Sequence, residues 1–358
     1  MTFGLCMIVK NEEQTLARCL RSVSGIFDEI IIVDTGSTDC TIQIAKNFTD
    51  KIYNFEWQHD FSLARNFAFS KAKSDYLMWL DADDVVNEQN KKALISLKKT
   101  LSSKIDMVFM RYAVSFDEND APTLMFERER LVKRKKNYQF VGAVHEVIVP
   151  SGNILHSDIT IFHKKIKKNG NSRRNLQIFE KLFTGGTTPN ARQKFYYARE
   201  LKDNGLYDAA VTAYSDFLHG DGWIEDKICA CRDLSFCYNR LNMPAHELSA
   251  LFKSFELDTP RAETCCAIGA FYFAFSLYEK AIFWYKLALN LKPNYSSGAF
   301  VFCDAYNFLP AISLCVCYDR LHDLKKAKFY NDLAGTFKPY DKNYLANKLY
   351  FEKIEGHL

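Results

Sequence analysis

The 358-residue sequence contains no apolar run of the roughly 18 residues that a membrane-spanning helix needs. Its start also lacks the pattern of a secretory signal peptide, because the polar residues 10–13 follow only a short apolar stretch. We therefore expect a cytoplasmic protein without a transmembrane segment. The net charge of +4 is too small to predict binding to nucleic acid or membranes by itself.

The eleven cysteines do not form a recognisable metal-binding pattern. Cys229 and Cys231, like Cys315 and Cys317, are two residues apart, which places the two side chains on different faces of a helix. In a chain of this size without a secretion signal, we expect free thiols that pack in the core. The sequence also lacks a G-x-G-x-x-G motif, so a dinucleotide site is not expected.

The length favours two domains, and the sequence pattern changes along the chain. Residues 1–113 alternate buried strands with amphipathic helices, which predicts a parallel α/β sheet with helices on both faces. Asn11 and Thr38 precede the first two helices and are expected to cap them. Residues 115–163 lose helical periodicity and are expected to complete a first domain, residues 1–165, as a β extension. Ligands of such sheets bind at the carboxyl ends of the strands.

The rest of the chain is expected to be a linker, residues 166–190, and a domain that is helical throughout, residues 191–358. Similar segments in this domain begin at positions 206, 243, 277 and 323, which are 37, 34 and 46 residues apart. A period near 34 resembles tetratricopeptide repeats, which stack helix pairs into a concave superhelix. The last, longer step implies an insertion. An irregular helical bundle is the alternative.

The strongest local signal is the segment WLDADD, residues 79–84, in which an apolar strand ends in three carboxylates. Like charges so close together are costly unless a cation neutralises them. Carboxylates also suit Mg²⁺ or Mn²⁺, which bind phosphate oxygens as well. The alternative is an acidic loop that leads into a helix at 88–101.

Two further positions point to substrate contacts. Asp34 ends another buried strand, before a turn rich in Gly, Ser and Thr, and could accept hydrogen bonds from a ribose or a base. Turn formation and helix capping would explain the same residues. Arg65 lies on a predicted helix beside the acidic strand and could contact substrate, although an exposed side chain is equally compatible with its position.

Four motifs occur in the order found in family 2 glycosyltransferases with the GT-A fold. They are CMIVKNEE at 6–13, VDTGSTD at 33–39, ARN at 64–66 and DAD at 81–83. Over roughly residues 2–165 the chain resembles this family, and it is similar to bacterial members with C-terminal tetratricopeptide-like repeats. Some of those transferases glycosylate peptides, including cysteine residues of bacteriocins. The resemblance implies a GT-A nucleotide-sugar domain followed by an all-α repeat domain.

The resemblance also implies roles for individual residues. Asp34 would contact the uracil or ribose of a UDP-sugar. Asp81 would face the ribose or the donor sugar, and Asp83 would ligate the metal ion. The rest of the donor pocket is expected along the backbone and side chains of Val9, Asn11, Glu12 and Arg65.

Two later positions complete the implied site. The segment FVGAVHE, residues 140–146, resembles one near the catalytic carboxylate of related transferases, so Glu146 is expected as the general base and His145 as its orienting neighbour. A structural His–Glu pair is the alternative. His163 follows an apolar strand where GT-A enzymes place a metal-ligating histidine, although a surface histidine is equally compatible. Twelve Lys or Arg against four acids between 127 and 174 predict a basic rim for the diphosphate.

We therefore expect a metal-dependent inverting glycosyltransferase that uses a UDP-sugar and Mn²⁺ or Mg²⁺. A concave helical surface favours a peptide or protein acceptor bound by the repeats, and homodimerisation through the repeats stays open. The alternatives are a transferase that extends a cell-surface oligosaccharide or lipid-linked glycan, a non-catalytic repeat scaffold, and a nucleotidyltransferase.

Overall fold

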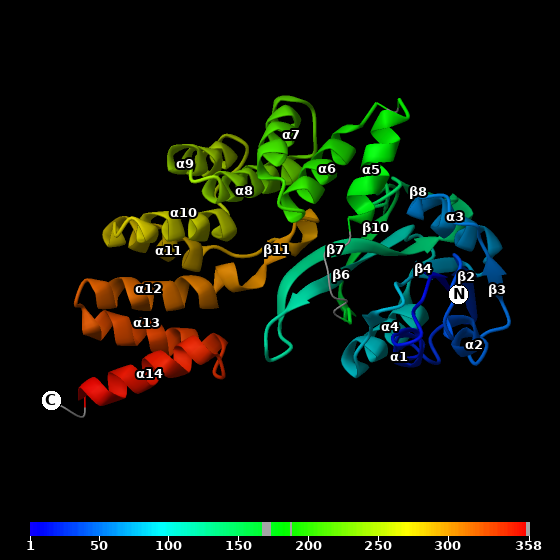
Figure 1. The fold of residues 1–358 in the computed structure, drawn as a ribbon. Helices are drawn as coiled ribbons and strands as arrows, with labels where there is room; N and C mark the ends of the chain where they lie inside the picture. The colour runs from blue at the N-terminus through cyan, green and yellow to red at the C-terminus, as the bar shows by residue number, and fades with distance from the viewer. Residues whose placement is uncertain (167–172, 187, 356–358) are drawn as a thin grey trace. The chain divides into compact units, whose positions relative to one another are not determined.

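The computed structural model describes residues 1–166, 173–186 and 188–355 (Figure 1). The chain folds into two compact units. The first consists of Met1–Ser115 and Phe126–Thr188, and the second of Phe116–Met125 and Pro189–Leu358. Among the described residues, none of the helices combines the length and the apolar character that crossing a membrane requires.

A mixed sheet with the strand order β3-β2-β1-β4-β7-β6-β10-β5 forms the framework of the first unit. The first four strands in this order pair in parallel, as predicted. The sheet is mixed rather than parallel throughout, because β7 comes from the expected β extension and lies antiparallel to β4. The strands are β1 (Phe3–Val9), β2 (Glu29–Asp34), β3 (Ile52–Asn54), β4 (Tyr76–Trp79), β5 (Asp84–Val85), β6 (Met107–Phe116), β7 (Pro122–Lys133) and β10 (Ile154–His163).

Helices cover both faces of this sheet, because the alternation along β1 sends successive side chains to opposite sides. Phe3, Leu5 and Met7 pack in one core cluster with residues of α1, α2 and α4, whereas Cys6 packs in another with Ala68 of α3. Both clusters are fully apolar and buried. The helices of this unit are α1 (Leu16–Ser22), α2 (Thr41–Ala45), α3 (Phe61–Lys71), α4 (Glu88–Thr100) and α5 (Arg174–Thr184).

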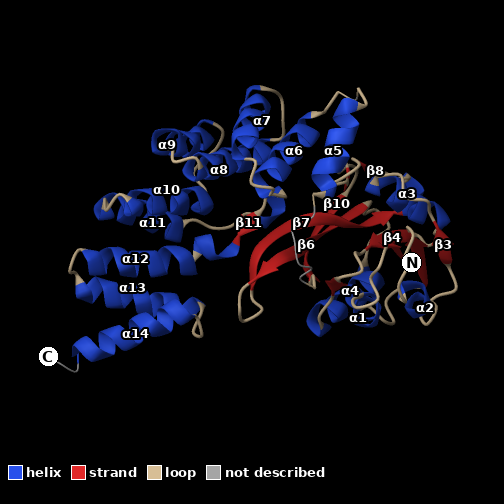
Figure 2. Cartoon of the chain, viewed as in Figure 1, coloured by secondary structure: helices blue, strands red, loops and turns tan. Residues whose placement is uncertain are grey.

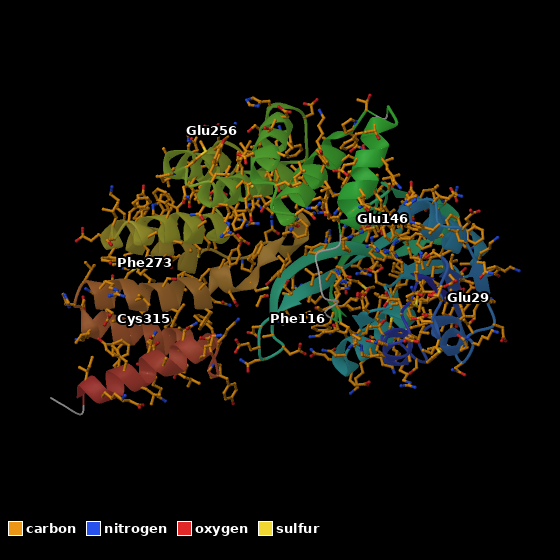
Figure 3. The ribbon with its side chains drawn as sticks, in the orientation of Figure 1. Glu29, Phe116, Glu146, Glu256, Phe273 and Cys315 are labelled. Atoms are coloured by element: carbon orange, nitrogen blue, oxygen red, sulfur yellow. The ribbon has the colours of Figure 1, made fainter. Side chains whose placement is uncertain are left out.

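The second unit is a series of antiparallel helix pairs (Figure 2). Side chains such as Phe273 and Cys315, from different helix pairs, belong to one hydrophobic cluster of these repeats (Figure 3). All eleven cysteines are free thiols, and most of them are buried, as predicted. The helices are α6 (Ala191–Asp203), α7 (Tyr207–His219), α8 (Ile224–Arg240), α9 (Pro244–Lys253), α10 (Ala262–Ala274), α11 (Tyr278–Asn290), α12 (Phe308–Arg320), α13 (Leu324–Phe337) and α14 (Lys342–Glu355).

The same tight turn joins the two helices of each pair. In every pair, the residue before the N-cap of the second helix has a positive φ, in the left-handed region that Gly and Asn tolerate best. These residues are Gly205, Asn242, Ser276 and His322. The N-caps that follow are the four positions at which the sequence pattern restarts, namely Leu206, Met243, Leu277 and Asp323. The tetratricopeptide-like repeat is thereby confirmed.

The expected insertion lies between α11 and α12. Residues 291–307 form no α-helix, so the prediction that the second domain is helical throughout is wrong for this segment. This segment contains short 3₁₀ turns and the strand β11 (Val301–Phe302). β11 pairs antiparallel with Leu124 and Met125 at the start of β7. The segment Phe116–Met125, which joins β6 to β7 as a hairpin, also makes an ion pair with the repeats. Nζ of Lys338 lies 2.7 Å from Asp117 Oδ2 in this hairpin and 2.7 Å from Asp304 Oδ2.

Candidate active site

Three of the sequence motifs meet at one edge of the sheet because their strands are parallel neighbours. Val9 at the end of β1 lies opposite Asp34 at the end of β2. On the other side of β1, Cys6 lies opposite Trp79, the last residue of β4. The segments that follow these strands therefore emerge together at the carboxyl edge, where ligands of α/β sheets bind.

The loops after β1 and β2 are joined by hydrogen bonds. Asn11, with φ of 54°, donates its backbone N–H to Ser37 Oγ over 3.0 Å and accepts from the Thr38 N–H through Oδ1 over 2.8 Å. The Glu12 N–H donates to Thr41 Oγ1 over 2.7 Å. The Asp34 carboxylate accepts from the backbone N–H groups of Ser37 and Gly36 in its own turn.

The predicted helix caps are therefore wrong, since Asn11 and Thr38 bind each other across the two loops. α1 begins only at Leu16, with Thr15 at its N-cap. α2 begins at Thr41, whose N–H donates to Asp39 Oδ1 over 2.9 Å. The loop side chains thus build a wall at the carboxyl edge of β1 and β2.

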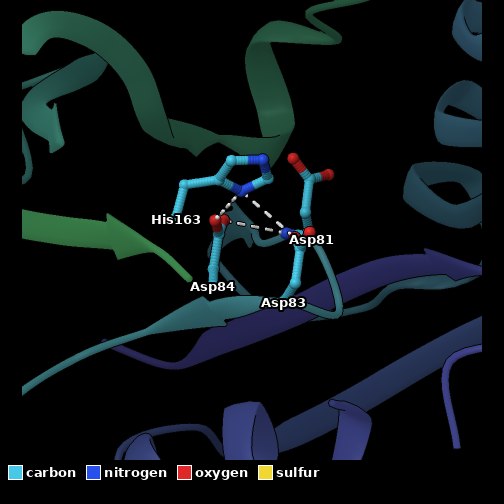
Figure 4. Close-up of side chains that lie close together, drawn as sticks. All are labelled: Asp81, Asp83, Asp84 and His163. Atoms are coloured by element: carbon cyan, nitrogen blue, oxygen red, sulfur yellow. Dashed lines mark hydrogen bonds and ion pairs between the residues drawn. The ribbon is translucent and has the colours of Figure 1, made fainter. Parts of the chain in front are cut away.

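Three carboxylates and one imidazole lie together beyond the end of β4 (Figure 4). Asp81, Asp83, Asp84 and His163 each offer a ligand atom, and these atoms all lie within 4.8 Å of one another. His163 Nδ1 is 3.1 Å from Asp83 Oδ1 and 3.0 Å from Asp84 Oδ1. Burial opposes the charged ring, but hydrogen bonds to Asp83 and Asp84 outweigh it and raise the pKa of His163 to about 9.

His163 reaches this cluster because β10 pairs antiparallel with β5, which sets His163 directly opposite Asp84. Asp84 is the innermost member and is fully buried. Its Oδ2 accepts from the Asp81 N–H over 2.9 Å and from Arg130 Nη1 over 3.1 Å, and its Oδ1 accepts from Tyr112 Oη over 2.9 Å. Asp84 is therefore held by the protein itself.

Sequence reasoning counted Arg130 only as one residue of the basic rim and missed its role in the acidic cluster; it lies on β7 and has a fully buried side chain. Its guanidinium lies between the rings of Trp79 and Tyr112, 3.8 and 4.0 Å from their centroids. Within the described residues, its Nε and Nη2 atoms make no hydrogen bond. Arg130 ends the charged run ERER at 127–130, and its place directly before Leu131 and Val132 is the signal that could have identified it.

Arg65 on α3 links the acidic cluster to the predicted base. Its Nη2 donates to Asp81 Oδ1 and its Nε to Glu146 Oε1, each over 2.6 Å. The central carbon of its guanidinium, Cζ, lies 4.6 Å from the centre of the Trp79 ring. Burial disfavours the Asp81 carboxylate, but the charges of Arg65, His163 and Arg130 outweigh it and hold the pKa of Asp81 below its ordinary value.

A tight turn between β8 (Phe140–Val141) and β9 (Val147–Ile148) positions Glu146. Gly142 and His145 in this turn have positive φ values of 101° and 51°. Asn66, next to Arg65, holds the turn by accepting from the Phe140 N–H over 2.7 Å. The structure thus brings Glu146 to the site, with Arg65 between it and the acidic cluster.

The predicted basic rim is only partly correct. Arg128 and Arg130 lie at the site, and Arg128 Nη2 donates to the Glu146 carbonyl over 2.8 Å. Lys133 instead pairs with Tyr76 at the opposite end of β4, far along the strand from the carboxylates. β7 is antiparallel to β4, so residues beyond Arg130 move away from the site. Lys167 and Lys168 lie outside the described residues.

An α/β sheet with an acidic cluster that could hold a metal ion at its carboxyl edge is the arrangement expected of a glycosyltransferase domain. Residues 5–162 match the family model Glycosyl transferase family 2. The first unit therefore carries a domain of the glycosyl transferase 2 family, and the predicted combination of this domain with tetratricopeptide-like repeats is confirmed.

Curated relatives resemble the chain over different lengths. The prophage-derived glycosyltransferase SunS of Bacillus subtilis is 30% identical over 63% of this chain and 57% of SunS, so the chain spans little more than half of that relative. A TPR repeat-containing protein of Synechococcus elongatus is 34% identical over 40% of this chain and 35% of its own. The lipopolysaccharide core biosynthesis glycosyltransferase LpsC of Rhizobium meliloti is 24% identical over 61% of this chain and 86% of LpsC.

Proposed function

We propose that this protein is a metal-dependent inverting glycosyltransferase that moves a hexose or N-acetylhexosamine from a UDP-sugar to a peptide or protein side chain. The acidic cluster with His163, joined through Arg65 to Glu146, supports this proposal most directly. The resemblance to transferases that glycosylate bacteriocin peptides and the presence of a repeat unit support a polypeptide acceptor.

The donor atoms of the cluster fit a divalent cation. Carboxylate oxygens and an imidazole nitrogen are ligands that Mn²⁺ accepts, and Mg²⁺ prefers the oxygens. Asp84 already accepts three hydrogen bonds, so Asp83 and His163 are the ligands that we propose. When bound, the ion would stabilise the negative charge that develops on the departing diphosphate.

The remaining residues of the chain orient the two substrates. Asp81, held by Arg65, would bind the ribose or the sugar of the donor, and Asp34 would bind the uridine. The joined loops that contain Val9, Asn11 and Glu12 form a preorganised wall for the nucleotide. Preorganisation matters because fixed groups need no reorganisation as charge develops in the transition state.

Glu146 would act as the general base. Its Oε1 is bound to Arg65, whereas its Oε2 makes no hydrogen bond in the described structure and is the oxygen that would take the proton. In the reaction, the acceptor oxygen or sulfur bonds to the anomeric carbon as the carbon–oxygen bond to UDP breaks. Attack from the face opposite UDP inverts the configuration. His145, next in the chain, would orient Glu146 or the acceptor.

Release of UDP from a panel of UDP-sugars, with Mn²⁺ or Mg²⁺, tests the donor half of this proposal. We expect metal-dependent turnover of one donor, and a loss of at least 100-fold in Asp83→Asn, since a metal ligand stabilises the transition state by several kcal/mol. The exposed Asp158→Asn variant on β10 is the matched control. Absence of donor binding and turnover under every condition would contradict the proposal and leave a repeat scaffold.

Transfer to a glycan acceptor is the second candidate, because 86% of LpsC, a lipopolysaccharide core biosynthesis glycosyltransferase, aligns with this chain. Mass spectrometry of reactions that offer the accepted donor together with either peptides or oligosaccharides separates the two. Glycosylated peptide supports the first proposal. Glycosylated oligosaccharide alone supports the second.

A further inference from the structure

The repeat unit contains a cavity of about 220 Å³ that lies apart from the catalytic residues in sequence. Residues of α8, of the start of α10 and of the insertion between α11 and α12 line it. Its lining mixes apolar side chains, such as Ile228 and Phe300, with six charged ones. The volume is below the 300–1,000 Å³ of typical small-molecule sites, so it suits one or two amino-acid residues rather than a nucleotide-sugar.

Most of the charge in this cavity is internally balanced. Arg261 binds Glu225 through Nη1 and Nη2, with Nη2 2.9 Å from Oε1, and also binds Asp258 Oδ2 over 2.9 Å. Glu263 is satisfied by neutral donors, since it accepts from the Phe302 N–H over 3.1 Å and from Tyr306 Oη over 2.7 Å. These carboxylates therefore do not need a further cation.

Two cations of the lining, Arg232 and Lys292, remain without a carboxylate partner at ion-pair distance in the described part of the chain. The Arg232 guanidinium lies 4.4 Å from the centre of the Phe302 ring, and its Nη2 is 3.6 Å from the sulfur of Cys229. Burial raises the pKa of the Cys229 thiol, so this sulfur stays protonated and does not neutralise the arginine. Arg232 is thus a cation with no carboxylate at ion-pair distance, although the more distant charges of Glu263 and Asp233 stabilise it.

We propose that this cavity binds a carboxylate of the polypeptide acceptor, with Arg232 and Lys292 as its cationic contacts. The inference rests on the proposed function, because it names a recognition element of the acceptor. Arginine matches the planar geometry of a carboxylate and can donate two parallel hydrogen bonds. Glu225, Asp258 and Glu263 in the same lining disfavour a multiply charged phosphate, whereas a singly charged carboxylate meets two cations that make no ion pair. The apolar side chains suit the methylene groups of an acidic residue.

Binding of short peptides to the full chain, measured by saturation-transfer NMR, tests this site. The probe is an acetylated and amidated Gly-Glu-Gly tripeptide, compared with Gly-Gln-Gly of the same kind and with acetylated Gly-Gln-Gly that has a free C-terminal carboxylate. We expect at least tenfold tighter binding of a carboxylate peptide than of the neutral one, as a charge-assisted hydrogen bond gives. The two charged probes show whether a side chain or a chain end supplies the carboxylate.

Arg232→Gln should remove this preference, whereas Arg240→Gln, at the exposed end of the same helix, should retain it. Lys292→Gln, on an exposed position, should weaken it without a risk to folding. Equal binding of charged and neutral peptides by the wild type, or a preference unchanged in both cavity variants, would overturn the site. UDP release is measured in parallel on the same proteins. Donor turnover without a preference for the carboxylate peptide would refute the proposed role of the cavity alone. A preference for the carboxylate peptide without donor turnover would refute the transferase proposal alone.

Discussion

Replacing Arg130 by Met should destabilise the first unit by about 3 kcal/mol, the lower end of the cost of breaking a buried ion pair, because His163 still faces the remaining Asp84 carboxylate. Arg130 and Asp84 both have fully buried side chains, 3.1 Å apart, so water cannot solvate the remaining carboxylate. Met retains much of the volume between the rings of Trp79 and Tyr112, which separates the loss of charge from the loss of packing. The double variant Arg130→Met/Asp84→Asn should recover part of this loss, because the carboxylate of the buried pair is removed as well.

Urea unfolding combined with hydrogen exchange of β4 and β7 peptides measures this change in the first unit alone. Arg111→Met on the neighbouring strand β6 is the control, since its partner Asp158 has a side chain that is 89% exposed. An exposed pair of this kind contributes at most about 1 kcal/mol. A loss below 1 kcal/mol in Arg130→Met, or a double variant no more stable than the single one, would refute the reasoning.

Two further predictions concern the repeat unit. Burial raises the pKa of Asp226 to about 6, so the folded chain holds this proton more tightly than the unfolded chain, and the free energy of unfolding should fall as pH rises from about 4 to about 6. Asp226→Asn should therefore add about 3 kcal/mol at pH 7 and flatten the pH dependence in denaturation curves, unlike the exposed Asp216→Asn. Lys338→Met should leave Asp117 and Asp304 facing each other, and hydrogen exchange of the Phe116–Met125 hairpin should accelerate.

Local patterns in the sequence predicted much of this molecule. The apolar run at Phe3–Val9 indicated a strand buried on both faces of the sheet, and the two core clusters follow it. The run of acids after Trp79 indicated the cluster at the edge of the sheet. The repeat period marked the turns before α7, α9, α11 and α13, because each repeat needs one residue in the left-handed region there.

Long-range pairing could not be predicted in the same way. Arg65 and Glu146 are 81 residues apart, and Arg130 and Asp84 are 46 apart, so no helix or strand period relates them. Their contacts depend on the strand order, in particular on β7 pairing with β4. The guanidinium groups of Arg65 and Arg130 both lie over the Trp79 ring. This packing forms only when the sheet is assembled.

The insertion that interrupts the repeat period connects several of these features. Residues 291–307 supply Phe300 and Val301 to the lining of the cavity, and the same segment supplies the strand that pairs with β7. β7 begins in this pairing and continues to Arg128 and Arg130, which contact Glu146 and Asp84. One uninterrupted strand therefore carries both the partner of the insertion and two arginines of the site. A plain repeat of 34 residues has no room for β11. This gives a physical reason for the 46-residue step between positions 277 and 323.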